Sequence, residues 1–240
     1  MAIKTELIDY THDGKAFDAF VAWDDAQDGA RPAVLVCHAW GGRSAHEEET
    51  ARKLAAMGYV GIAIDVYGKG KRGTTKEECQ ALMTPLVENR PLLVERLVAG
   101  QQAAAALDRV DPARIAVCGY CFGGLCALIM ARDNTGVVGA TAFHAILGGP
   151  GPETAPITAK VLALQGWDDP MSTPDDIRAF GDEMTARKAD WQLHAYGGVM
   201  HAFTNKQAND PGFGTVYDAA ADRRSWTAFT DFLTELFQAP

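Results

Sequence analysis

One stretch constrains the fold of this chain more than any other, and it reads Arg-Ile-Ala-Val-Cys-Gly-Tyr-Cys-Phe-Gly-Gly at residues 114–124. A short apolar run ends at Gly119, Cys121 follows two residues later, and two further glycines open a segment with a helical pattern. The pattern is typical of a nucleophile elbow, in which a reactive side chain occupies a strained turn between a strand and a helix. Glycines flank such a turn because a Cβ atom there would collide with the neighbouring strand or helix.

The residue at the turn is a cysteine, and its surroundings decide whether it can react. The helix that follows presents its first N–H groups and the positive end of its dipole, which favour a thiolate and an oxyanion. A thiol with an ordinary pKa of about 8.5 is mostly protonated at neutral pH, so a nucleophilic Cys121 also needs a base or a positive environment. The alternative is a strand–helix turn that holds a buried, structural cysteine.

Apolar runs of strand length alternate with helical patterns along the rest of the chain. Residues 3–23 predict two antiparallel strands, because the Asp13-Gly14 pair between strand-like runs is a hairpin signal. We expect further strands at 33–37, 59–64, 114–118, 137–143, 160–165 and 191–196, and helices at 45–57, 82–107, 125–131, 174–188 and 218–237, with breaks at Pro85 and Pro91. This alternation predicts one α/β domain over residues 1–240, built on a mostly parallel sheet with helices on both faces.

Composition narrows the class of protein. The net charge of −9 argues against a nucleic-acid binder, since phosphate recognition needs a basic face. No apolar run approaches the length of about 20 residues that spans a bilayer, and the first residues, Met-Ala-Ile-Lys-Thr-Glu-Leu, lack the apolar core of a signal peptide. Five cysteines without a second ligand pair favour reduced thiols over zinc or dithiol chemistry. We therefore expect a cytoplasmic protein with no metal, cofactor, nucleic-acid or membrane partner.

Several residues with reactive or titratable side chains follow predicted strands directly. In a parallel sheet, chemistry collects at the carboxyl ends of the strands, so residues in these positions are expected to share one edge. The residues concerned are His38, Asp65, Cys121, His144, Asp168 and His201. His144 either lines the pocket or is a satisfied loop residue, and Asp65 is more typical of a carboxylate that tethers a loop.

Three of these residues have the order of a catalytic triad. Cys121, Asp168 and His201 follow the sequence nucleophile, acid, histidine, which is the order of α/β hydrolases. His201 would act as base and the carboxylate would fix its tautomer and orientation. Asp169 is the alternative acid; we expect Asp168 because Pro170 suits Asp169 to the turn. His201 could also be an ordinary loop histidine.

Acyl transfer also needs donors for the developing oxyanion. The N–H of Phe122, directly after the nucleophile, is one expected donor. The second is expected from the loop His38-Ala39-Trp40-Gly41-Gly42, with Ala39 as the candidate. His38 either hydrogen-bonds near the thiol or braces this loop.

The chain resembles the dienelactone hydrolase family of α/β hydrolases. The resemblance rests on Gly-Tyr-Cys-Phe-Gly-Gly at 119–124, on the Gly-x-x-Asp type loop Gly-Trp-Asp-Asp at 166–169, on Met-His-Ala-Phe at 200–203 and on the strand region 59–67. It implies an α/β-hydrolase fold, a monomer, and a triad of Cys121, His201 and Asp168. It also implies hydrolysis of carboxylic ester or lactone bonds. Thioester cleavage or acyl transfer on the same triad, and a non-catalytic ligand-binding or redox-sensing protein, are the alternatives.

Two positions depart from the family pattern. A Glu follows the third strand in dienelactone hydrolase proper and helps to control ionisation of the thiol, whereas this chain has His38. An Arg four positions after the catalytic histidine holds the substrate carboxylate in that enzyme, whereas this chain has Asn205. We therefore expect an ester or lactone other than carboxymethylenebutenolide to be the best substrate.

Overall fold

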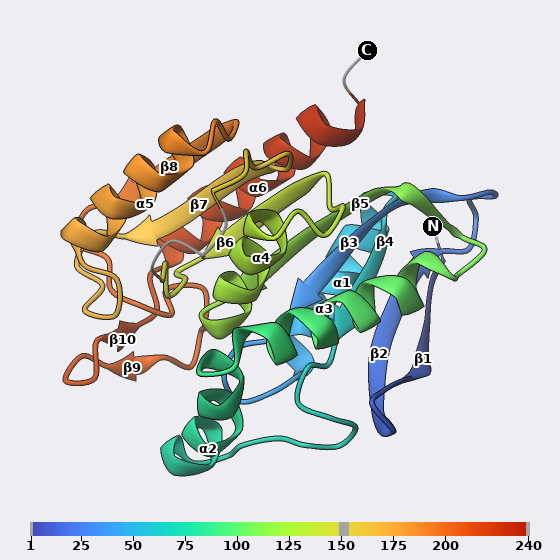
Figure 1. The fold of residues 1–240 in the computed structure, drawn as a ribbon, viewed down its shortest axis with the longest axis horizontal. Helices are drawn as coiled ribbons and strands as arrows, with labels where there is room; N and C mark the ends of the chain where they lie inside the picture. The colour runs from blue at the N-terminus through green and yellow to red at the C-terminus, as the bar shows by residue number, and fades with distance from the viewer. Residues whose placement is uncertain (1, 149–153, 239–240) are drawn as a thin grey trace. The chain divides into compact units, whose positions relative to one another are not determined.

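A computed structural model describes residues 2–148 and 154–238. The chain divides into two compact units, residues 1–118 and 119–240. Each unit contains strands with helices packed on them, and the colours of Figure 1 follow the residue number through both units. The two units are described in turn.

The first unit contains four neighbouring strands, in the order β1-β2-β4-β3. Strand β1 (Ile3–His12) pairs antiparallel with β2 (Lys15–Asp24), and β2 pairs antiparallel with β4 (Val60–Ile64). Strand β3 (Arg31–Cys37) runs parallel to β4. Asp13 and Gly14 join β1 to β2 with φ values of 48° and 69°, as the hairpin signal predicts.

Three helices accompany these strands. Helix α1 (Ala45–Ala56) packs against β2 and β4, and α3 (Arg90–Ala105) packs against β1. The predicted helical stretch at 82–107 is in fact two helices, α2 (Lys76–Val87) and α3. The division falls at Asn89, whose side chain accepts the Leu92 N–H at 3.2 Å and caps α3. Pro91 then lies in the first turn of α3, where a missing N–H costs little.

The boundary between the two units lies within β5 (Val110–Tyr120), and the second unit begins at Gly119. Helix α4 (Phe122–Arg132) follows at once and packs against β6 (Gly139–Phe143). Strands β6, β7 (Lys160–Gly166) and β8 (Trp191–Tyr196) lie side by side and run parallel. Helix α5 (Pro174–Ala186) connects β7 to β8, and α6 (Ala219–Gln238) packs against β6 and β7.

A short hairpin in the second unit has no counterpart in the predicted elements. It consists of β9 (Asn209–Asp210) and β10 (Thr215–Val216), which pair antiparallel between β8 and α6 in the chain. Figure 1 shows it as a small ribbon with both strands labelled. Strands of two residues carry no periodicity, which is why pattern analysis misses them.

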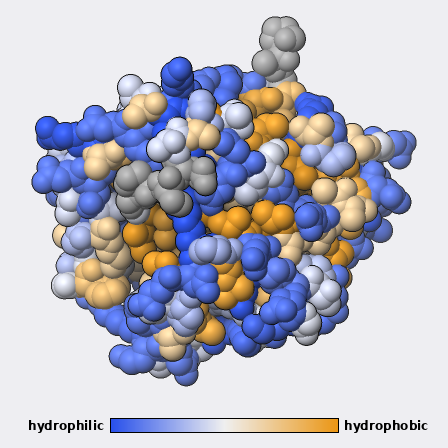
Figure 2. Space-filling model, viewed as in Figure 1, coloured by the Kyte–Doolittle hydropathy of each residue, from blue (hydrophilic) through white to orange (hydrophobic). Residues whose placement is uncertain are grey.

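The core consists of apolar side chains that are buried from solvent. Every residue of α4 is buried, and five phenylalanines of the second unit are no more than 1% exposed: Phe122, Phe143, Phe180, Phe203 and Phe229. The face seen in Figure 2 is mainly hydrophilic, with apolar side chains between the charged ones. Among the described residues, no helix is long and apolar enough to cross a bilayer.

Candidate active site

Cys121 occupies the strained turn that the glycine pattern predicts. It lies between β5 and α4 with φ 57° and ψ −115°, a conformation that costs a non-glycine residue about 1–3 kcal/mol. Its N–H donates to Phe143 O at 3.0 Å, which ties the turn to β6. A Cβ atom on Gly119 would lie 2.1 Å from Gly123 O, so only glycine allows the strand and the helix to meet this closely.

The five cysteines are all free thiols, and they differ in exposure. Cys121 is partly exposed, whereas the others are buried: Cys37, Cys79, Cys118 and Cys126. Burial raises the pKa of the Cys37 and Cys118 thiols, which keeps them protonated and unreactive. Cys121 is therefore the thiol that combines access with a helix N-terminus.

His201 is held by the carboxylate next to the one we predicted. Its Nδ1 lies 2.7 Å from Asp169 Oδ2, and both side chains are buried, 1% and 2% exposed by residue. Asp168 is exposed, and its N–H donates to Val199 O, so the prediction that Asp168 contacts the histidine is wrong. The Gly-x-x-Asp spacing counted from Gly166 ends at Asp169, and that count is the signal that would have found it.

Cys121 is the second group, after Asp169, that affects the pKa of the His201 imidazole. Burial by itself lowers the pKa of His201, but the charge of Cys121 and hydrogen bonding to Asp169 and Cys121 outweigh it and raise the pKa to about 10. The Nε2 atom is buried and has no well-aligned hydrogen-bond partner among the described residues. Loose alignment between a catalytic base and its nucleophile is common before substrate binds. The raised pKa favours the imidazolium form of His201 at neutral pH.

The unpredicted hairpin fixes the backbone of His201. The His201 N–H donates to Gly214 O at 2.9 Å, and Val216 N–H donates to His201 O at 3.0 Å. Both partners belong to the β9–β10 hairpin or its turn, and His201 forms an isolated bridge with Thr215. The imidazole is thus held from the backbone side by the hairpin and from the ring side by Asp169.

His144 lies next to His201. The ring centroids are 5.1 Å apart in an edge arrangement. His144 Nε2 lies 2.8 Å from Thr204 Oγ1, and its φ of 36° marks a second strained residue after β6. Both histidines are buried. The buried ring of His144 has a polar partner, as the interpretation of a satisfied loop residue requires.

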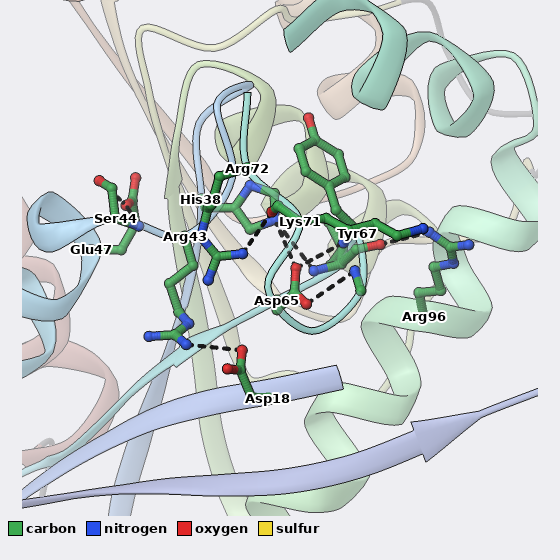
Figure 3. A network of polar contacts seen from close by, with 12 residues as sticks. Asp18, His38, Arg43, Ser44, Glu47, Asp65, Tyr67, Lys71, Arg72 and Arg96 are labelled. Carbon is green, nitrogen blue, oxygen red and sulfur yellow. Dashed lines mark hydrogen bonds and ion pairs between the residues drawn. The ribbon is translucent and has the colours of Figure 1, made fainter. Parts of the chain in front are cut away.

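The first unit holds His38, which is buried and neutral. His38 Nδ1 lies 2.7 Å from Ala39 O and Nε2 accepts the Val66 N–H at 3.2 Å, which fixes the proton on Nδ1. Burial lowers the pKa of His38, so the neutral form persists. Figure 3 shows His38 above Asp65, whose carboxylate accepts the N–H groups of Tyr67 and Gly68. Asp65 thus tethers a loop, as its sequence position indicates.

The loop after β3 is braced on several sides. Ser44 caps α1, and Glu47 Oε2 accepts the Ser44 N–H and hydroxyl at 2.8 Å and 2.7 Å. Glu47 Oε1 accepts the Ala39 N–H at 3.2 Å. The Ala39 N–H is therefore engaged by Glu47 in this structure, and its expected role as an oxyanion donor stays a prediction. Tyr67 adds a further brace by donating to Trp40 O at 2.9 Å.

The strand-end residues fall into two groups by unit. Cys121, His144, Asp169 and His201 lie together in the second unit, and His38 and Asp65 lie together in the first, 3.8 Å apart between Nε2 and Oδ1. Within the described ranges, no group of three or more His, Cys, Asp or Glu residues is arranged to hold a metal ion.

Comparison with known proteins identifies the family of this chain. The dienelactone hydrolase family matches residues 17–237. The chain belongs to this family. A solved dienelactone hydrolase-like promiscuous phosphotriesterase from metagenomic libraries is 31% identical, with a TM-score of 0.92 over 99% of this chain and 100% of the other. The solved structure named m3DLH is 33% identical, with a TM-score of 0.94 over the same shares.

A curated relative from Aquifex aeolicus agrees with this assignment. It is named as a proposed carboxymethylenebutenolidase and is 25% identical over 237 residues, which cover 95% of this chain and 96% of the relative. This member of the dienelactone hydrolase family is therefore a hydrolase that acts on ester bonds. Its fold is the expected α/β-hydrolase fold, with a mostly parallel central sheet, helices and an N-terminal antiparallel hairpin.

Proposed function

We propose that this hydrolase cleaves small carboxylic esters or lactones with Cys121 as nucleophile, His201 as base and Asp169 as the carboxylate that orients His201. The observation that carries the proposal is the 2.7 Å contact between His201 Nδ1 and Asp169 Oδ2, together with the strained turn that holds Cys121 at the start of α4. The raised pKa of His201, to which Cys121 and Asp169 both contribute against the effect of burial, supports the same assignment. An imidazolium beside a thiol stabilises the thiolate, which is the reactive form.

The reaction then proceeds in two halves. The Cys121 thiolate attacks the carbonyl carbon, a C–S bond forms, and the carbonyl electrons move onto oxygen. When the oxyanion collapses, the C–O bond to the leaving group breaks and the leaving oxygen takes the proton from His201 Nε2. His201 next removes a proton from water, the hydroxide attacks the thioester, and the C–S bond breaks to release the acid and regenerate the thiolate.

The oxyanion needs a donor beside the nucleophile. Phe122 is the first residue of α4, and its N–H belongs to the end of the helix that carries positive partial charge. We assign this N–H as one donor. The Ala39 N–H is bound to Glu47 in this structure, so a second donor from that loop requires the Glu47 contact to give way when substrate binds.

We propose a substrate that carries no carboxylate near Asn205, the position at which the family resemblance implies an arginine. Asn205 is exposed and its Oδ1 accepts the Gln207 N–H at 3.0 Å, so the side chain there is a neutral amide engaged in its own turn. The curated relative is named for a substrate that carries a carboxymethylene group. A neutral ester or lactone of similar size suits this chain better.

The test compares two cysteine variants of the same helix region. Cys121→Ala is expected to abolish hydrolysis of p-nitrophenyl acetate and of a small aryl lactone, whereas Cys126→Ala removes a buried thiol from α4 and retains activity within about twofold. Iodoacetamide should inactivate the wild-type enzyme and Cys126→Ala alike. Full turnover by Cys121→Ala would overturn the proposal. Competing nucleophiles separate hydrolysis from acyl transfer, because a hydrolase releases only the free acid.

Phosphotriesters form a second candidate substrate class. The dienelactone hydrolase-like relative that matches 99% of this chain is described as a promiscuous phosphotriesterase. A thiolate can displace an aryloxide from a neutral phosphotriester, forming an S–P bond that water then cleaves. Release of p-nitrophenol from paraoxon should then require Cys121. No release above the rate of Cys121→Ala would exclude this second activity.

A further inference from the structure

Gln165 has no role in the mechanism above, yet its side chain contacts the acid of the triad. It lies in β7, one residue before the end of the strand, and is fully buried. Its Nε2 donates to Asp169 Oδ2 at 3.0 Å. The same carboxylate oxygen lies 2.7 Å from His201 Nδ1. Two side-chain donors therefore converge on one oxygen of Asp169.

The backbone fixes which end of the Gln165 amide faces Asp169. The Ala145 N–H donates to Gln165 Oε1 at 3.1 Å, and Nε2 donates to Ala145 O at 3.3 Å. Since Oε1 is held by an N–H group, the amide nitrogen must point toward the carboxylate. Ser172 secures Ala145 in turn, because its hydroxyl donates to Ala145 O at 2.8 Å. The orientation of Gln165 is thus set by groups outside the triad.

The contacts to Asp169 leave its carboxylate little freedom to rotate. Oδ1 accepts the Met171 N–H at 2.8 Å, while Oδ2 faces both His201 and Gln165. Without Gln165, one donor on each oxygen would remain, and the oxygen facing His201 would have lost its fixed neighbour. A carboxylate that orients an imidazole must itself be held in place.

We propose that Gln165 is a positioning residue of this hydrolase, which holds Asp169 Oδ2 toward His201 by means of an amide anchored on Ala145. The proposal rests on the proposed function, because it requires that Asp169 orients His201. Gln165 acts through Asp169 and does not touch the reacting atoms. Its effect therefore falls on kcat, whereas KM for a small ester stays nearly constant.

The first test removes the donor and keeps the volume. Gln165→Met is expected to lower kcat on p-nitrophenyl acetate about tenfold, the effect of one hydrogen bond, with KM unchanged within about twofold. In an Asp169→Asn background the same change should have little further effect, since the group that Gln165 positions is already altered. An undiminished kcat in Gln165→Met overturns the proposal, as does an equal loss in both backgrounds.

The second test replaces the amide by an acid. In Gln165→Glu two carboxyl groups meet at about 3 Å, and they cannot both ionise readily. The introduced carboxyl, while protonated, donates to Asp169 as the amide does, so activity should approach that of the wild type at acidic pH and fall more steeply as the pH rises. Gln192→Glu, on the exposed part of β8, carries the same charge change and should keep the wild-type pH profile. Activity of Gln165→Glu that does not recover at acidic pH would overturn the proposal, because the protonated carboxyl supplies the donor that the amide supplies in the wild type.

The outcomes separate this inference from the proposed function. If Asp169→Asn keeps full activity, the triad assignment fails and Gln165 has nothing to position. If Asp169→Asn is impaired while Gln165→Met and Gln165→Glu both behave as wild type, only the inference about Gln165 fails. Should Gln165→Met not fold, as judged by circular dichroism, the pH profile of Gln165→Glu decides.

Discussion

Two buried histidines, His38 and His201, follow parallel strands of this protein and have opposite electrostatic character. Burial lowers the pKa of His38, whose ring nitrogens meet a backbone carbonyl and a backbone N–H at hydrogen-bond distance. His201 is equally buried, but the charge of Cys121 and the bonds to Asp169 and Cys121 raise its pKa to about 10. For His38, burial outweighs the Asp65 carboxylate at 3.8 Å, and the ring stays neutral. For His201, the hydrogen bond to Asp169 and the effect of Cys121 outweigh burial.

The loops that carry His38 and His201 are also held by different contacts. The loop that carries His38 is held by Glu47, Tyr67 and Val66, so its backbone is a rigid support. The loop that carries His201 is fixed by the β9–β10 hairpin, while the ring keeps one nitrogen directed away from Asp169.

The largest predicted effect is the loss of kcat when His201 is replaced, compared with the loss when His38 is replaced. His201→Gln should lower kcat by about 10⁴-fold or more, because the base and the counter-charge of the thiolate are both lost. His38→Gln should cost far less, about tenfold, because glutamine can replace part of the loop contacts. Steady-state hydrolysis of p-nitrophenyl acetate measures both. Equal losses in the two variants would remove the distinction between brace and base.

The next prediction separates two neighbouring carboxylates. Asp169→Asn should lower kcat by about 10³–10⁴-fold, since the amide favours the wrong tautomer of His201. Asp168→Asn, at an exposed position, should stay within about threefold of wild type. Thermal unfolding of both variants serves as the control for folding. The reverse order of effects would restore Asp168 as the acid.

The pH behaviour of the two rings gives a third prediction. The pKa of His201 lies above the ordinary value of 6.5, so its imidazolium persists through neutral pH and loses its proton only as the pH approaches 10. Cys121→Ala removes the charge of Cys121 and its hydrogen bonding, so the His201 pKa should fall and the ring should deprotonate at lower pH.

NMR titration of the histidine ring protons measures this shift. Since burial lowers the pKa of His38, that ring should stay neutral throughout the range in which His201 titrates. Assignments follow from the His201→Gln and His38→Gln variants. An unchanged His201 titration in Cys121→Ala would show that the thiol does not act on the ring.

The smallest predicted effect concerns the hydrogen bond by which Tyr67 holds the loop after β3. Tyr67→Phe removes the hydroxyl that donates to Trp40 O and should lower the free energy of unfolding by about 0.5–1.5 kcal/mol. Activity should fall only slightly, because the loop keeps its contacts to Glu47 and His38. Chemical denaturation and ester hydrolysis together measure the two effects. A large loss of kcat with unchanged stability would assign this loop a more direct role.

Strong local patterns made much of the fold predictable. The Asp13-Gly14 hairpin, the parallel strands and the glycine-bounded turn at Cys121 follow from periodicity and from positions where the backbone needs glycine. Two features differ from the prediction for physical reasons. The predicted break near Pro91 is present, at the Asn89 cap, but Pro85 lies inside α2 and does not end it. The β9–β10 hairpin depends on tertiary contacts to His201.

The candidate site was predictable in type and less so in detail. The turn at Cys121 has the predicted strained backbone, but the carboxylate that contacts His201 is Asp169 and not Asp168. Asp169 is buried beside His201, and local turn preference does not reveal that contact. The catalytic roles of these residues stay a proposal. The engagement of Ala39 with Glu47 is likewise a tertiary contact that no spacing reveals. The single-domain, monomeric and cytoplasmic organisation of the chain stays a prediction.

The backbone of Cys121 has a consequence for the evolution of stability in this protein. A φ of 57° with a ψ of −115° is ordinary for glycine and strained for cysteine. Cys121→Gly should therefore raise the melting temperature while it abolishes activity. Under the proposed mechanism, selection for stability favours glycine at this position, whereas selection for activity favours the strained cysteine.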